Sequence, residues 1–144
     1  MLQNMKCVLG LFMLCLLACT ENKYAGIPEK YHALLDQALV KAGDNATEWV
    51  SGAFFNAADT QKEGMAFLIA YMPERDLKEL TADFLLENTA YAYQAREKYV
   101  WAREIPDTVF LNDVLPYVSL NETREGWRKE FYERFGKYVQ HCKT

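Results

Sequence analysis

The stretch "DLKELTADFLLENTAYAYQARE", from Asp76 to Glu97, carries the longest apolar pattern in the chain. Its apolar side chains recur at helical spacing: Leu77, Leu80, Phe84, Tyr91 and Ala95. This spacing predicts one helix over 76–97. Asn88 falls in the middle of the same face, where two interpretations stand: a buried amide bonded to a neighbouring backbone group, or a contact to a substrate.

The sequence before this stretch predicts three shorter helices. The first is expected between Pro28 and Gly43, residues that favour a helix start and a helix end, with Tyr31, Leu34, Leu35, Ala38, Leu39 and Ala42 on its apolar face. A second begins at Asn45, with Glu48 three positions on as its capping partner, and presents Trp49, Ala53 and Phe54. A third begins at a capping box of Thr60 and Glu63, carries Phe67, Leu68, Tyr71 and Met72, and ends at Pro73.

The last helix has the clearest amphipathic pattern. One stripe collects Trp127, Phe131, Phe135, Tyr138 and Cys142, and this stripe is predicted to face the core. Glutamates and basic residues four positions apart, such as Glu130 with Arg134, occupy the exposed faces. No alternating strand pattern interrupts these segments, so we expect an all-α fold, a compact bundle of about five or six helices.

The N-terminus is predicted to be an export signal. Lys6 precedes an uncharged apolar run from Cys7 to Ala18, which is shorter than the roughly 20 residues of a membrane-spanning helix. The following "LLAC" (16–19) resembles the lipobox of bacterial lipoproteins, which implies cleavage before Cys19 and acylation of that cysteine. The resulting division is a signal peptide over 1–18, a short tether over 19–27 and a helical domain over 28–144. The alternative is an ordinary signal peptide with an incidental cysteine.

Composition excludes several classes of function. The chain has 144 residues, 51% of them hydrophobic, which is the size and composition of one globular domain. Its net charge of −4 without a basic stripe argues against a nucleic-acid partner. After signal removal and acylation of Cys19, Cys142 is the remaining thiol, so no intramolecular disulfide is expected.

Catalytic and metal-binding patterns are weak. His141 and Cys142 are adjacent and would point about 100° apart on a helix, so they cannot form a nucleophile–base pair. His32 with Asp36 supplies too few ligands for a structural zinc. Helix capping accounts for Asp107, and Ser119 with Glu122 forms a capping box for the last helix. We therefore predict no metal, no cofactor and no catalytic residue in this chain.

Four segments in order carry a family resemblance: "ADFLLENTAYAYQARE", "IPDTVFLNDVLPY", "LNETREGWRKEF" and "VQHCKT". They resemble the helical region that precedes the catalytic core in bacterial transglutaminase-like secreted lipoproteins. The resemblance implies a papain-like core after Thr144, with a cysteine, histidine and aspartate triad of which no position lies in this chain. It also implies that a polar ridge borders the cleft of that core: Asn112, Asp113, Asn121, Glu122 and Arg128. Helix capping alone is the alternative role for this ridge.

The expected function follows from these interpretations. The chain is expected to be a lipid-anchored domain of the bacterial cell envelope, periplasmic or at the cell surface, and a non-catalytic part of a cysteine enzyme acting on amide bonds of peptides or proteins. The alternative is a complete small surface lipoprotein that binds a protein or glycan through exposed aromatic residues, for which Tyr91, Tyr93, Tyr99 and Trp101 are the candidates.

Overall fold

The computed structural model describes residues 23–119 and 122–139, and these residues form helices and their connections without a strand. The expected all-α fold is confirmed. The helices are η2 (Glu29–Tyr31), α2 (His32–Ala42), η3 (Gly43–Asn45), η4 (Glu48–Phe54), η5 (Asp59–Gln61), α3 (Lys62–Ala70), α4 (Glu74–Glu79), α5 (Ala82–Lys98), α6 (Val100–Arg103), α7 (Asp107–Val109), η6 (Phe110–Val114) and α8 (Trp127–Val139). Seven of these elements are α-helices, because the predicted helix over 76–97 is broken and the short α6 and α7 add to the number.

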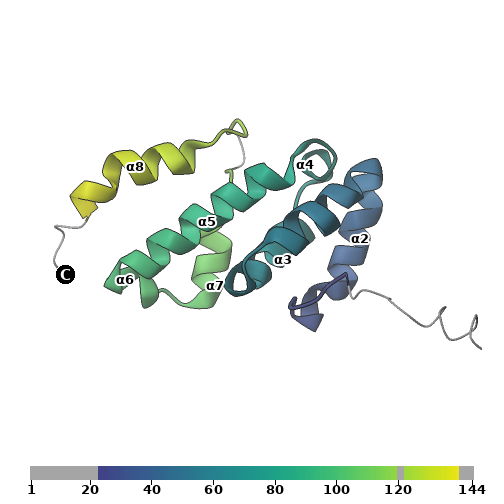
Figure 1. The fold of residues 1–144 in the computed structure, drawn as a ribbon, viewed down its shortest axis with the longest axis horizontal. Coiled ribbons are helices and arrows are strands. Elements are labelled where there is room, and N and C mark those ends of the chain that lie inside the picture. Colours follow the sequence, from purple (N-terminus) through teal and green to yellow (C-terminus); the bar gives the residue numbers. More distant parts are fainter. Residues whose placement is uncertain (1–22, 120–121, 140–144) are drawn as a thin grey trace, which may run out of the picture.

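Figure 1 shows α2 at one end of the molecule and α8 lying along α5 toward the other end. Between them, α3 packs against α2, η4 and α5 and forms the centre of the fold. The core contains side chains with at most 1% of their surface exposed, from six elements: Leu35, Trp49, Met65, Ile69, Leu77, Leu85 and Phe110. Trp49 also donates from Nε1 to the Leu77 carbonyl at 2.9 Å, which satisfies its polar atom inside the core.

The predicted helix over 76–97 is two helices. The first helix, α4, ends at Glu79. The backbone is extended at Leu80 and Thr81. The second helix, α5, begins at Ala82, and the Thr81 side chain accepts a hydrogen bond from the Phe84 amide at 3.3 Å. The apolar spacing runs through this break, so the periodicity does not reveal it. Thr81, a good helix cap, is the local signal that marks the boundary.

The expected capping pair of Asn45 and Glu48 is wrong, because both side chains serve other elements. Asn45 donates to the Leu77 and Leu80 carbonyls at 2.9 and 3.0 Å, at the end of α4. Glu48 accepts from the Ala82 amide at 2.7 Å, so it caps the N-terminus of α5. These bonds satisfy the free carbonyls of one helix and the free amide of the next across the break.

Two further expected caps also differ. The Thr60–Glu63 capping box was predicted at the start of α3, but the residue before α3 is Gln61, whose side chain makes no capping bond. Glu63 forms an ion pair with Lys30 at 2.6 Å instead. Glu122 accepts from the Ser119 amide at 2.9 Å, which is half of the predicted box, but α8 begins only at Trp127. The first helix matches its prediction: it ends at Ala42, and Gly43 follows with a φ of 58°.

The N-terminal boundary lies earlier than expected. Tyr24 and Ile27, assigned to the tether, are buried in the core at 5% and 7% exposure. The predicted signal peptide, Cys19 and the first residues of the tether lie outside the described residues. Within 23–119 and 122–139, no helix combines the length and the apolar character needed to cross a bilayer.

Candidate functional site

A buried carboxylate organises the segment that leads into α8. Asp76 on α4 is 1% exposed and accepts from the Tyr117 hydroxyl at 2.8 Å and from the Arg124 guanidinium at 2.9 Å through both Nε and a terminal nitrogen. Such a two-pronged bond fixes the angle as well as the distance of the arginine. This Asp76 cluster (Asp76, Tyr117, Arg124) holds the chain after η6 against α4.

The electrostatics of the cluster are those of a closed structural unit. Burial raises the pKa of Tyr117, and its hydrogen bond to Asp76 adds to this effect, so the hydroxyl remains a donor. The hydrogen bond that Arg124 donates to Asp76 raises the pKa of Arg124. Both oxygens of the carboxylate accept hydrogen bonds inside the cluster. The sequence analysis did not identify it, since its members are 41 and 48 positions apart.

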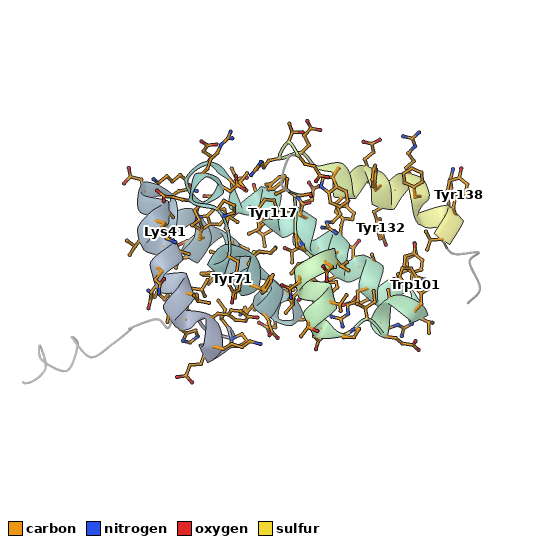
Figure 2. All side chains as sticks on the ribbon, turned by 180° about the vertical axis from the view of Figure 1, so that it is seen from behind. Lys41, Tyr71, Trp101, Tyr117, Tyr132 and Tyr138 are labelled. Atoms are coloured by element: carbon orange, nitrogen blue, oxygen red, sulfur yellow. The ribbon has the colours of Figure 1, made fainter. Side chains whose placement is uncertain are left out.

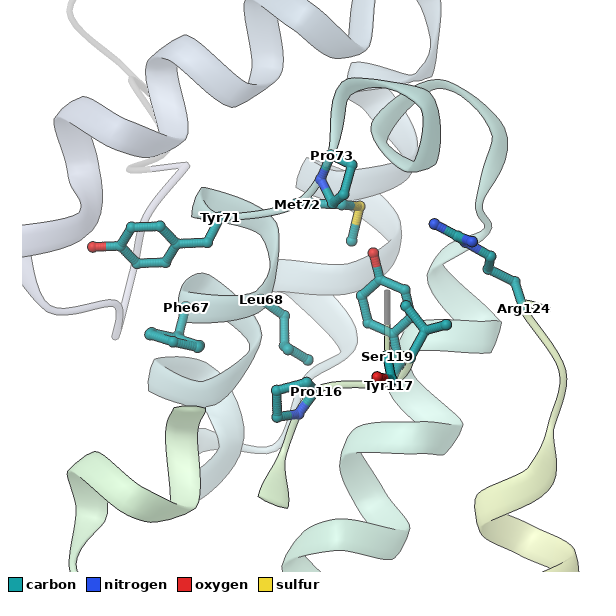
Figure 3. A pocket seen from close by; sticks show the side chains of 10 residues that line it. Phe67, Leu68, Tyr71, Met72, Pro73, Pro116, Tyr117, Ser119 and Arg124 are labelled. Carbon is teal, nitrogen blue, oxygen red and sulfur yellow. The ribbon is translucent and has the colours of Figure 1, made fainter. Parts of the chain in front are cut away.

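An apolar groove of about 260 Å³ lies beside this cluster (Figure 3). Phe67, Leu68, Met72, Pro73 and Pro116 supply much of its wall, and the Tyr71 ring points outward at its edge. Tyr117, Val118, Ser119 and Arg124 also line it, and the polar atoms of Tyr117 and Arg124 are directed to Asp76. The wall is mostly apolar, so the groove can bury apolar groups.

Arg128 anchors the start of α8. Its side chain is buried, and one terminal nitrogen donates to the carbonyls of Leu115 and Pro116 at 3.2 and 2.8 Å. Trp127 beside it donates to the Tyr117 carbonyl at 2.9 Å. Desolvation lowers the pKa of Arg128 to about 10. Arg128 thus joins α8 to the Asp76 cluster through the segment 115–117.

The rest of α8 packs on α5 through a face that the sequence analysis did not choose. Tyr132 lies against Tyr91 with ring centroids 5.3 Å apart, and the Tyr99 hydroxyl donates to the Gly136 carbonyl at 3.1 Å. In Figure 2, Tyr132 lies on the α5 side of α8. Gly136 is buried at this contact, and a Cβ at this position would lie 3.5 Å from the Tyr99 hydroxyl, an ordinary contact distance.

The predicted core stripe of α8 is therefore wrong, because it faces outward. Phe131, Phe135 and Tyr138 are 51%, 43% and 62% exposed, and Trp127 is partly exposed. Phe131 packs edge-on against both Trp127 and Phe135, with centroids 5.6 and 5.4 Å apart. Trp127, Phe131 and Phe135 thus form a row of contacting rings, and Tyr138 follows three positions further along the helix. We call these four residues the α8 stripe. Cys142, the fifth predicted member, lies outside the described residues.

The predicted polar ridge is not gathered in one place. Asn112 and Asp113 are exposed on η6, where Asn112 donates to the Thr108 carbonyl at 2.7 Å. Glu122 lines a hollow of about 300 Å³ together with Thr123, Glu125, Trp127 and Phe131, so it borders the α8 stripe. Arg128 is buried as described above, and Asn121 lies outside the described residues. The role of the ridge as a cleft border stays a prediction.

The aromatic binding candidates divide into two pairs. Tyr91 packs on Tyr132, and Tyr93 is partly buried against Phe110 with centroids 5.0 Å apart. Tyr99 and Trp101 stack at 5.8 Å and 15°, and Trp101 is 43% exposed. Of these four residues, Trp101 is exposed and the three tyrosines are partly buried.

The remaining candidates for chemistry have structural roles. The buried Asn88 donates to the Phe84 carbonyl at 2.9 Å, which favours the first interpretation of that amide. Asp107 does not cap a helix; it pairs with Arg96 at 2.7 Å. His32 bonds to the Ile27 carbonyl at 3.0 Å, while Asp36 binds Lys23 and Tyr24. The described part of the chain holds no group of three potential metal ligands, and His141 lies outside it.

Comparisons with known proteins leave the family open. No protein-family model, curated protein or solved structure matches this chain.

Proposed function

We propose that this chain is the lipid-anchored, non-catalytic helical domain of a transglutaminase-like cysteine enzyme of the bacterial cell envelope. Cys19 would carry the lipid, and the catalytic core would follow the last helix and act on amide bonds of peptides or proteins. The α8 stripe is the observation that carries this proposal. Four aromatic residues on an exposed helix face are typical of a surface covered by another domain.

The position of the stripe also supports the proposal. It lies on the last described helix, so a domain joined after this helix would begin next to the surface it is proposed to cover. Arg128 and the Asp76 cluster fix the beginning of α8, which sets the direction in which the stripe faces. The hollow lined by Glu122 and Glu125 at the edge of the stripe would lie at the border of that interface.

The test compares a soluble form of residues 20–144 with the longer protein encoded at intact loci. In the short form, an apolar dye should bind the exposed stripe, and the double variant Phe131→Ser/Phe135→Ser should reduce its fluorescence. Val40→Ser, at a position that is 82% exposed on α2, is the control and should leave the dye signal unchanged. In the longer protein, backbone amides of α8 should exchange more slowly than in the short form. The absence of a cysteine–histidine–aspartate core after residue 144 at those loci would reject the proposal.

A second candidate function is the binding of a glycan by a complete surface lipoprotein. The exposed Trp101, stacked on the partly buried Tyr99, favours it, because sugar rings pack on broad aromatic faces. Titration of residues 20–144 with envelope oligosaccharides, followed by tryptophan fluorescence, tests this candidate. Binding that is lost in Trp101→Ala and retained in Phe131→Ser would favour the glycan-binding function over the docking function.

A further inference from the structure

An exposed phenylalanine lies beside the point where the described chain begins. Phe55 is 81% exposed, although the adjacent Phe54 is buried in the core. A hollow of about 560 Å³ surrounds it, lined by Lys23, Ala25, Val50, Phe54, Phe55 and Lys62. We call this surface the Phe55 face. Its residues come mainly from the start of the domain (Lys23 and Ala25) and from η4 and the residue after it (Val50, Phe54 and Phe55).

The local structure holds Phe55 outward. The Asn56 side chain donates to the Gly52 and Ser51 carbonyls at 2.7 and 3.3 Å, which closes the end of η4 next to Phe55. The Ala57 amide donates to the Ala53 carbonyl at 3.0 Å and continues this closure. These hydrogen bonds fix the backbone at the end of η4, so the Phe55 side chain stays at the surface and can contact an apolar partner.

The chain length between the anchor and this face limits what that contact can be. Lys23 lines the Phe55 face, and four positions separate it from Cys19, a span of at most about 14 Å when fully extended. Tyr24 is already buried in the core, so the domain begins directly after this span. A lipid on Cys19 therefore keeps the Phe55 face close to the bilayer surface.

The charges on the face are compensated within the protein. Lys23 pairs with Asp36 at 2.7 Å, and Lys62 pairs with Asp59 at 2.9 Å. Neither amine is left to attract an anionic headgroup strongly. Contact with a membrane would thus depend on burial of the phenylalanine among the acyl chains near the headgroups, and would change little with salt.

We propose that the Phe55 face is the surface with which this domain rests on the membrane. The inference depends on the proposed lipid anchor at Cys19 and adds an orientation to it. The start of α2 and the end of η4, which both contact Tyr24, lie toward the bilayer. α8 lies toward the other end of the molecule from α2 (Figure 1). The partner is the lipid surface itself rather than a protein.

Photo-crosslinking of the full chain in bacterial cells tests the inference. Benzoylphenylalanine replaces Phe55 in one protein and Val40 in the other; the two positions are 81% and 82% exposed, so neither replacement disturbs the core. Val40 lies about 12 Å along the axis from the start of α2 and does not line the Phe55 face. After irradiation, mass spectrometry measures lipid adducts on the peptide that carries each probe.

We expect several-fold more lipid adducts at position 55 than at position 40, and the same ratio after a high-salt wash. Equal adduct yields from chains recovered in the membrane fraction would overturn the Phe55 face and leave the lipid anchor intact. Adducts at position 55 to a protein instead of lipid would also overturn it. Recovery of both chains in the soluble fraction would reject the anchor, and with it this inference.

Discussion

Removal of the carboxylate in the Asp76 cluster should destabilise the fold in a way that depends on Tyr117. In Asp76→Asn, the Tyr117 hydroxyl and the Arg124 guanidinium both lose their charged acceptor. A hydrogen bond to a charged group contributes about 1.5–3 kcal/mol, and a buried donor left without a partner costs about 1–3 kcal/mol. We therefore expect Asp76→Asn to lower the free energy of unfolding by about 3 kcal/mol.

Tyr117→Phe should cost less, about 1.5–2 kcal/mol, because the carboxylate keeps its bonds to Arg124. In the double variant, the hydroxyl and the carboxylate are both absent, so the loss of the bond between them is counted once. The two costs should therefore fall short of additivity by about 1 kcal/mol.

Urea unfolding of residues 20–144 at pH 7, followed by circular dichroism, measures these free energies. Glu48→Gln combined with Tyr117→Phe is the matched control, since Glu48 bonds to Ala82 and shares no partner with Tyr117, and its costs should add. Full additivity of Asp76→Asn with Tyr117→Phe would refute the reasoning, because it would mean that the hydroxyl and the carboxylate do not interact.

Five single variants test separate parts of the structure. Phe131→Ser should cost about 1 kcal/mol and Tyr132→Ser about 3 kcal/mol in urea unfolding, because Tyr132 packs on α5 whereas Phe131 contacts its own helix; equal costs would contradict the orientation of α8. Glu48→Gln should cost about 1–2 kcal/mol by weakening the charged cap of α5. Gly64→Ala should cost about 1–3 kcal/mol, measured as a lower thermal midpoint, since its Cβ would lie 2.6 Å from the Tyr93 hydroxyl. The hydrogen bond from Lys23 lowers the pKa of Asp36, so its stabilisation is present above the unfolded pKa of 3.8 and is lost as pH falls through the folded value; Asp36→Asn should flatten the loss of stability below pH 4.

Local signals in the sequence predicted the class of the fold and its first helix. Pro28 and Gly43 act on the backbone next to them, so their effects can be recognised without knowing the fold. Asn45 and Glu48 have the spacing of a local cap, yet each bonds to residues more than 30 positions away. Sequence spacing cannot reveal such bonds, because they depend on how α4 and α5 are placed.

The orientation of α8 could not be predicted for a different reason. An amphipathic pattern shows which residues share a face, but it does not say which face the rest of the protein covers. On this helix, α5 offers Tyr91 and Tyr99, which fit around Tyr132 and Gly136. The aromatic stripe consequently remains outside, and the sequence alone would assign it to the core.

The way α8 is attached has a consequence for its opening in the native state. Of its thirteen residues, Arg128 and Gly136 are buried, so its separation from α5 exposes far less surface than global unfolding. Amide protons of α8 should therefore exchange through a sub-global opening of low free energy, while those of α3 exchange only when the whole domain unfolds. A molecule that binds only while α8 is packed on α5 would raise the free energy of this opening. At concentrations well above its Kd, the increase would grow with the logarithm of its concentration.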